Sequence, residues 1–298
     1  MICKTIKISR SSYYRRLNKI SFEQKHKELI IKIKEIFHSS KSRYGYIRVT
    51  RQLKKEGINC SKHLVYKLMK INNLSGLRKP RRFRTKDKST TLSGVCPNVL
   101  KGRFNPDEIS LFWSSDITYI RTLEGFLYLC VIMDLCSKKI VGWQTSDNID
   151  ESLVIETLFN ALKNPSVTVR KNQIFHSDRG VQYRAKAFTE YLSTYQFTQS
   201  MSAKGYCYDN APLEAFFSTL KRELIYRTKF KTREEAARAI FEYIEVFYNR
   251  QRLHSTIGYL TPVEYEKIKY EKLKNDNIVT KNRNIFINNL KLNTQNHT

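Results

Sequence analysis

Helical periodicity governs the first 75 residues of the chain. Residues 21–38 are expected to form an amphipathic helix that Ser21 can cap. Its apolar positions recur every three or four residues: Leu29, Ile30, Ile33, Ile36 and Phe37. A second helix is expected over residues 46–56, with Gly57 as its stop, and a third after a Ser61 cap. Three short helices with basic faces are typical of a helix-turn-helix bundle, although a bundle that only packs fits the same pattern.

From about residue 109 the apolar pattern becomes strand-like. Three strands joined by short turns should form an antiparallel meander: Ile109 to Ile120, Gly125 to Leu135 and Lys139 to Thr145. The first of them is expected to end at Asp116 or just beyond. Helices and strands then alternate: helix 151–163, strand 172–176, helix 184–195, strand 196–200, and helices 211–226 and 233–249. This order predicts an α/β fold with a mixed sheet and flanking helices, as in the ribonuclease H-like fold.

Positive charge is concentrated in the first third of the chain. Residues 1–105 carry 28 Lys and Arg against 5 Asp and Glu, and so supply +23 of the total net charge of +27. A region so basic indicates a polyanionic partner such as DNA, although a ribosomal or membrane-surface protein would show similar charge. The basic run expected to lie along DNA phosphates consists of Arg78, Lys79, Arg81, Arg82 and Arg84.

Composition divides the chain into four segments. Residues 1–74 are the helical region, 75–105 a basic linker, 106–272 the α/β core with C-terminal helices, and 273–298 a polar tail expected to be disordered. The six cysteines form no Cys-x-x-Cys pair, which suits a reducing cytoplasm and argues against a disulfide framework or a zinc site. No apolar stretch reaches 18 residues, so we expect no membrane insertion and a cytoplasmic, nucleoid-associated protein.

Three acidic residues stand in recognisable local patterns. Asp116 lies in WSSDITY on the first strand, Asp178 lies in HSDRG after the fourth, and Glu214 ends DNAPLE at the start of a helix. Converging carboxylates suit hard divalent cations, two of which can clamp the attacking and leaving oxygens of a phosphodiester. Each residue alone also has a structural explanation: a strand end, an Asx turn or a favoured helix N-terminus. Asp134 is the rival ligand, but its position better suits ending its strand or capping the next turn.

Several longer motifs resemble one family. They are DITY from Asp116, HSDRGVQY from His176, SAKG from Ser202 and DNAPLEAFFSTLK from Asp209. They resemble the integrase-core transposases of bacterial insertion sequences with two overlapping reading frames, within the retroviral-integrase superfamily, and the chain looks like the second-frame product. YNRQRLHS from Tyr248, followed by TPVEY, is similar to that family's C-terminal signature, and YGYIR from Tyr44 to its accessory helix-turn-helix.

The resemblance implies a DDE recombinase. Asp116, Asp178 and Glu214 would be its catalytic residues and the ligands of Mg²⁺ or Mn²⁺, with two ions expected. Water would free a 3′-hydroxyl at the end of the element, and that hydroxyl would attack a second phosphodiester without a covalent enzyme–DNA bond. Expected partners are DNA (transposon ends and target), further copies of the chain in a dimer or higher assembly, and the helix-turn-helix protein of the first frame.

Neighbouring residues are given lesser roles. Lys204 and Lys221 are expected to contact DNA, although a solvated loop lysine and a structural salt bridge are the respective alternatives. His176 should pack or orient Asp178, and Trp113 should belong to the core. Two other functions stay open: a metal-dependent nuclease of the same fold, which cleaves without joining, and an inactive DNA-binding derivative of a transposon.

Overall fold

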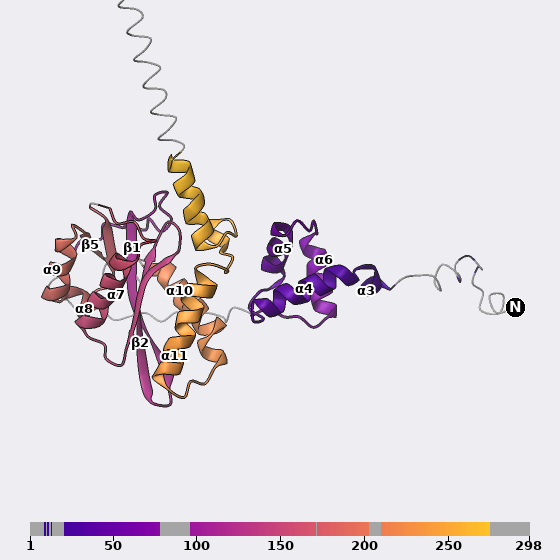
Figure 1. The fold of residues 1–298 in the computed structure, drawn as a ribbon, viewed down its shortest axis with the longest axis horizontal. Coiled ribbons are helices and arrows are strands. Elements are labelled where there is room, and N and C mark those ends of the chain that lie inside the picture. The colour runs from indigo at the N-terminus through magenta and orange to yellow at the C-terminus, as the bar shows by residue number, and fades with distance from the viewer. Residues whose placement is uncertain are drawn as a thin grey trace, which may run out of the picture. The chain divides into compact units, whose positions relative to one another are not determined.

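The chain forms two compact units (Figure 1), one within Met1–Arg82 and the other within Phe83–Thr298. The computed structural model describes residues 9, 11, 13, 21–77, 96–170, 172–202 and 210–274. The division between the units falls inside the expected linker, residues 75–105. Most of that linker and nearly all of the polar tail lie outside the described residues, so the four segment boundaries stay predictions.

The N-terminal unit is helical. Its described residues include the helices α3 (Phe22–Lys25), α4 (Lys27–Ser39), α5 (Tyr46–Lys55) and α6 (Lys62–Ile71). Ser21 caps α3 in a reciprocal capping box with Gln24, and Ser61 caps α6 by accepting from the Leu64 N–H. The helix expected over residues 21–38 is divided, because the backbone of His26 leaves the helical region at φ −117° and ψ 22°. The buried faces pack together through Ile33, Ile36, Phe37, Val49, Leu53, Val65, Leu68 and Met69.

The second unit is built on a mixed five-stranded sheet. Its strands are β1 (Phe112–Thr122), β2 (Gly125–Asp134), β3 (Ile140–Ser146), β4 (Ile174–Ser177) and β5 (Thr198–Met201). They lie in the order β3-β2-β1-β4-β5. The expected meander is confirmed, since β1, β2 and β3 pair antiparallel, and β4 and β5 extend the sheet from β1 in parallel. The predicted ribonuclease H-like arrangement, with β1 in the middle, is therefore correct.

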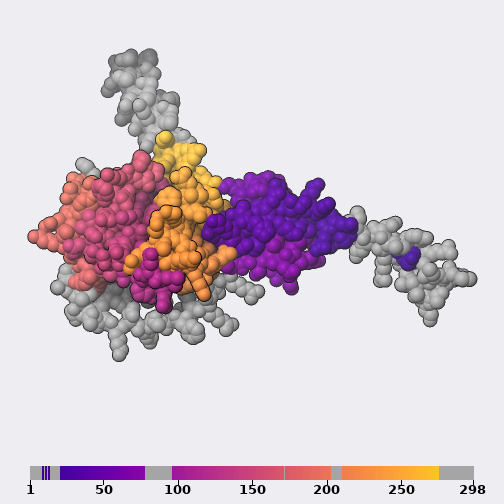
Figure 2. Space-filling view, turned by 60° about the horizontal axis from the view of Figure 1, so that its bottom comes forward, coloured from indigo at the N-terminus to yellow at the C-terminus, as the bar shows by residue number. Residues whose placement is uncertain are grey.

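Helices cover both faces of this sheet. They are α7 (Glu151–Lys163), α8 (Val181–Arg184), α9 (Lys186–Thr194), α10 (Ala211–Glu223) and α11 (Arg233–Phe241). Short 3₁₀ turns lie at Ile225–Arg227 and Ser255–Ile257, α11 continues as the π-helix Glu242–Tyr248, and residues 262–274 form a last helix. α7 packs on β2 and β3, whereas α10 and α11 pack on β1 and β2. In Figure 2, α10, α11 and the segments after them (orange to yellow) form a continuous surface on this unit.

Three of the helices expected in the second unit are bounded differently from the prediction. The helix expected over 184–195 is α8 followed by α9, because Ala185 adopts an extended backbone at φ −57° and ψ 137°. The helix expected to reach residue 226 stops at Glu223 and tightens into a 3₁₀ turn. The helix expected over 233–249 widens into a π-helix for its second half.

The expectation that the first strand ends near Asp116 is wrong. β4 pairs with β1 only over Phe112–Ser114, but β2 pairs with it as far as Thr122. The hairpin with β2 therefore carries β1 six residues past Asp116. Asp116 lies just beyond the last residue that has a neighbouring strand on both sides, where the sheet narrows.

The face of the sheet under α7 and α9 holds an apolar core. The core residues are Trp113, Cys130, Ile132, Val141, Leu153, Val154, Leu158, Ala161, Phe175, Tyr183, Phe188, Leu192, Phe197 and Met201. Gly142 on β3 allows the close approach of α7. A Cβ at this position would lie 2.6 Å from the Ala161 Cβ and 2.7 Å from the Thr157 carbonyl oxygen.

Candidate active site

Asp116 follows two buried serines on β1. Consecutive side chains of a strand point to opposite faces, so Ser114 and Asp116 share the face covered by α10, and Ser115 points to the other. One oxygen of the half-buried Asp116 carboxylate accepts from the Ile117 N–H at 2.8 Å. The central position of β1 therefore presents this carboxylate near the line where the sheet narrows.

Asp178 follows β4 directly, as the sequence predicts. Its Oδ1 accepts from the Gly180 N–H at 2.9 Å, which forms an Asx turn and leaves the other oxygen available. Arg179 fixes the turn by donating its Nε–H to the Ser202 carbonyl at 2.8 Å. Because β1 and β4 are parallel, the turn lies at the end of the sheet toward which β1 runs past Ser114.

Glu214 lies in the first turn of α10 and is half-buried. One turn earlier, the N-cap residue Asn210 does not cap the helix with its side chain. Its Oδ1 instead accepts from the Ser114 hydroxyl at 2.7 Å. Residues four apart share one face of a helix, so this bond turns the Glu214 side of α10 toward β1.

The three carboxylates interact electrostatically. Burial and then the negative charge of Asp178 are the main causes that raise the pKa of Asp116 from 3.8 to about 7; the charge of Glu214 also raises it, whereas the bond from the Ile117 N–H and the charge of Lys221 lower it. A bound cation would offset the repulsion among the three carboxylates, and hard oxygen ligands suit Mg²⁺ or Mn²⁺. Among the described residues, however, no three His, Cys, Asp or Glu side chains lie close enough together to hold one ion as they stand.

Lys221 lies on the same helix as Glu214. Its ammonium is 5.0 Å from the centre of the Tyr119 ring on β1, a cation–π contact. Burial lowers the pKa of Lys221 while Asp116 raises it, so the two charges are near one another. No carboxylate of the described residues pairs with Lys221 within ion-pair distance, which leaves the salt-bridge alternative without support.

The other end of α10 is fixed by a buried ion pair that the sequence did not reveal. Glu223 accepts from Arg252 at 2.9 and 3.0 Å, and from the Tyr243 hydroxyl at 2.9 Å. Arg252 belongs to the YNRQRLHS motif. The carboxylate of Glu223 raises the pKa of Arg252 although burial alone would lower it. The C-terminal motif thus holds the helix that carries Glu214.

The remaining sequence expectations can be compared with the structure. Trp113 is fully buried in the core, as expected. His176 bonds through its two ring nitrogens to the hydroxyls of Ser200 and Ser202, so it joins β4 to β5. Asp134 accepts from the Ser110 N–H and from both the N–H and the hydroxyl of Ser137, as a residue that caps a turn does.

Several residues expected to contact DNA lie outside the described residues. They are Arg78, Lys79, Arg81, Arg82, Arg84 and Lys204. Their roles stay predictions. None of the described helices is long and apolar enough to cross a membrane.

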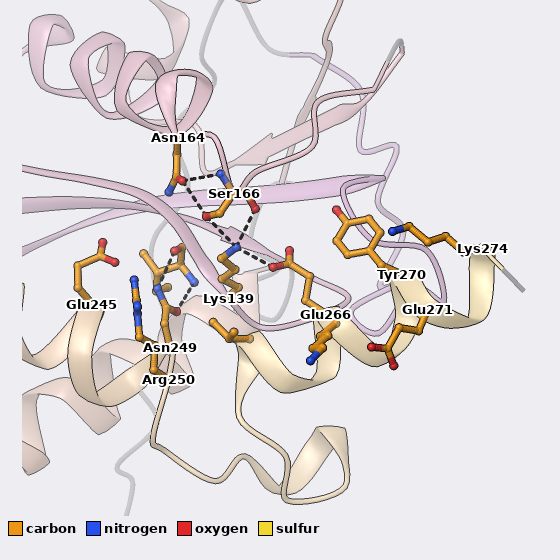
Figure 3. Close-up of a pocket in the computed structure, with 13 residues that line it drawn as sticks. Lys139, Asn164, Ser166, Glu245, Asn249, Arg250, Glu266, Tyr270, Glu271 and Lys274 are labelled. Carbon is orange, nitrogen blue, oxygen red and sulfur yellow. Dashed lines mark hydrogen bonds and ion pairs between the residues drawn. The ribbon is translucent and has the colours of Figure 1, made fainter.

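A hollow of about 770 Å³ lies between the start of β3, the π-helix and the last helix (Figure 3). Asn249 exchanges two hydrogen bonds with the backbone of Ile140, and Lys139 pairs with Glu266 at 2.6 Å. The three carboxylates do not line this hollow, and several of its polar groups are paired with one another. The hollow therefore lies at the packing interface between the sheet and the C-terminal helices.

Known protein families match most of the chain. Two integrase core domain families match residues 110–207 and 214–269, and an HTH-like domain matches residues 24–82. The catalytic core domain of BIV integrase is similar in fold at a TM-score of 0.41, with 18% identity over 55% of this chain and 99% of that chain.

Curated relatives cover most of the chain. The transposase for insertion sequence element IS904 of Lactococcus lactis subsp. lactis (strain IL1403) is 40% identical over 239 residues, or 79% of this chain and 92% of that protein. Transposase InsF for insertion sequence IS3A of Escherichia coli (strain K12) is 35% identical over 272 residues, or 89% of this chain and 92% of that protein. With these matches and an integrase core, the chain belongs to the insertion-sequence transposases.

Proposed function

We propose that the chain is a DDE transposase, which cleaves DNA at the ends of an insertion sequence and joins the freed 3′-ends to a second site. The observation that carries the proposal is the mutual influence of Asp116, Asp178 and Glu214 on an integrase core. Burial and two like charges raise the pKa of Asp116 to about 7. A bound cation would offset the repulsion between these carboxylates. Transposase relatives with 35 to 40% identity support the same reaction class.

The three carboxylates are the proposed ligands of Mg²⁺ or Mn²⁺. When bound, such ions activate the attacking oxygen and stabilise the leaving 3′-oxygen of the phosphodiester. Without a cation, the raised pKa of about 7 favours a proton on the Asp116 carboxylate near neutral pH, and Asp116 must release this proton to act as a ligand. Because the three groups do not yet form a ligand cluster, cation binding would also draw them together.

Lys221 is the described residue best placed to hold DNA near the carboxylates. Its half-buried ammonium lies beside Asp116 and over Tyr119, and no described carboxylate pairs with it. A phosphate oxygen of the DNA end would supply the missing partner. The exposed basic residues of the N-terminal unit would add the sequence-independent attraction that strand transfer between two DNA ends requires.

The test is cleavage and strand transfer of labelled insertion-sequence ends in Mg²⁺. We expect Asp116→Asn, Asp178→Asn and Glu214→Gln each to lower both steps by several orders of magnitude while DNA affinity stays nearly unchanged. Asp147→Asn, an exposed aspartate of the same unit, is the matched control and should retain activity.

The outcome also separates the alternatives. Cleavage without any joined product would indicate a nuclease of the same fold. DNA binding without Mg²⁺-dependent cleavage would indicate an inactive derivative. If one of the three variants keeps near-normal activity, that residue is not a ligand.

A further inference from the structure

We propose that Ser114 and Ser115 are positioning residues that set the distance of Glu214 and Asp178 from Asp116. These two serines directly precede Asp116 on β1. Ser114 forms a hydrogen bond to the start of the helix that carries Glu214, and Ser115 forms one to the segment that follows Asp178. The inference rests on the proposed function, because it gives these two serines a role in assembling the proposed metal site.

Ser114 holds the Glu214 helix. Its hydroxyl donates to Asn210 Oδ1 at 2.7 Å, and the Asn210 Nδ2 lies 3.5 Å from the Ser115 carbonyl oxygen. Asn210 is the first residue before α10, and an asparagine there normally bonds its own helix. Here it gives up that bond, so the start of α10 is held by the strand rather than by its own cap.

Ser115 holds the segment after Asp178 from the opposite face of the sheet. Its hydroxyl donates its single hydrogen to the Val131 carbonyl at 3.0 Å, so the Tyr183 hydroxyl, at 2.9 Å, is the donor in the second bond. Tyr183 lies on α8, five residues after Asp178, and is buried. The Asp178 turn and Tyr183 are thus parts of one short segment tied to β1.

The two bonds form a pair of tethers around Asp116, named here the Asn210 tether and the Tyr183 tether. All four residues are at most 7% exposed, so solvent cannot replace a missing partner. Consecutive strand residues point to opposite faces, and only that alternation allows adjacent serines to hold a helix above the sheet and a segment below it. Three carboxylates repel one another without a cation, and the tethers oppose this spreading.

The experiment measures Mg²⁺ affinity as well as activity in the full-length chain. Ser114→Ala opens the Asn210 tether, and Ser115→Ala or Tyr183→Phe opens the Tyr183 tether. Mg²⁺ and Ca²⁺ binding is followed by isothermal titration calorimetry without DNA, and the Mg²⁺ concentration for half-maximal cleavage is measured separately. Ser137→Ala is the matched control, because it also removes a buried hydroxyl bond, at 2.8 Å, but to Asp134.

We expect each tether variant to weaken Mg²⁺ binding and to raise the half-maximal Mg²⁺ concentration by roughly 10-fold, the low end of the effect of losing a group that orients metal ligands. Ser115→Ala with Tyr183→Phe should be no worse than either alone, because both open one tether. Ser114→Ala with Tyr183→Phe should multiply the two effects. Ser137→Ala should lower thermal stability without changing Mg²⁺ dependence.

The inference is overturned if the tether variants lose stability like Ser137→Ala but keep wild-type Mg²⁺ affinity and half-maximal concentration. If Ser114→Ala does not fold, Ser114→Cys keeps the volume with only a weak donor and decides the Asn210 tether. Failure of the proposed function looks different: the wild-type chain itself would bind no Mg²⁺ and cleave no DNA.

Discussion

The buried ion pair at the end of α10 gives the sharpest prediction on stability. Arg252 and Glu223 are 4% and 2% exposed and are joined by three hydrogen bonds of 2.9, 3.0 and 3.3 Å. Removing Arg252 takes away the close counter-ion of the buried Glu223 carboxylate and leaves it with weaker partners such as the Tyr243 hydroxyl and Arg222, and breaking such a buried pair costs about 3–5 kcal/mol. We therefore expect Arg252→Met to lower the unfolding free energy of the second unit by that amount.

Urea unfolding followed by tryptophan fluorescence measures this loss in the full-length chain. The two tryptophans, Trp113 and Trp143, both lie in the second unit, and the Trp143 indole donates to Glu245 of the π-helix. Arg250→Met, at an exposed arginine of the same motif, is the control and should change the unfolding free energy little.

A second variant tests the physical cause. Adding Glu223→Leu to Arg252→Met removes the stranded charge, so the double variant should recover much of the stability. An Arg252→Met protein within about 1 kcal/mol of the wild type would refute the reasoning, because an uncompensated buried carboxylate must destabilise the fold by more than that. A double variant less stable than the single would show that poorer packing, rather than the unpaired charge, causes most of the destabilisation.

Three further perturbations have definite expected outcomes. In metal-free buffer, wild-type stability should fall as pH rises from about 4 to about 7, since the folded pKa of Asp116 is raised above its unfolded value. Asp116→Asn should make this fall shallower, because the raised pKa values of Asp134 and Glu266 remain, and it should be more stable than the wild type at pH 8 by up to about 4 kcal/mol in urea titrations. Gly142→Ala should cost about 1–3 kcal/mol by calorimetry, because its Cβ would lie 2.6 Å from that of Ala161, and an unchanged melting temperature would contradict the packing. Replacing the exposed α6 lysines Lys62, Lys67 and Lys70 with Gln should flatten the plot of log DNA affinity against log salt by about 0.9 for each phosphate that the variant no longer neutralises, whereas Lys186→Gln on α9 should not.

The sequence predicted those parts of the fold that are encoded locally. The Ser21 and Ser61 caps, the three-stranded meander and the extent of α7 follow from short-range patterns, and each is confirmed. The length of β1 was not predictable, because its residues beyond Asp116 are held by β2 rather than by their own propensity. The π-helix was likewise missed, since its apolar spacing reads as an ordinary helix.

For the candidate site, the three carboxylates were predictable from the sequence, but the hydrogen bonds that hold the segments carrying them were not. The bond between Ser114 and Asn210 joins positions 96 residues apart, and the bond between Ser115 and Tyr183 joins positions 68 apart. No local sequence pattern indicates that two single polar residues so far apart in the chain form a hydrogen bond. Only Asn210 offered a signal, as an asparagine directly before a helix, and that signal predicts a cap that the structure does not have.

The Arg252–Glu223 pair also affects the order in which parts of the chain can fold during protein synthesis. Asp116 lies on a meander whose strands are neighbours in sequence, so this part can form while the rest of the chain is still being made. The helix that carries Glu214 gains its second anchor only when residue 252 has left the ribosome. An unfinished chain can therefore form its N-terminal helices and the meander before the helix that carries Glu214 is anchored, so that synthesis itself delays the assembly of the three carboxylates.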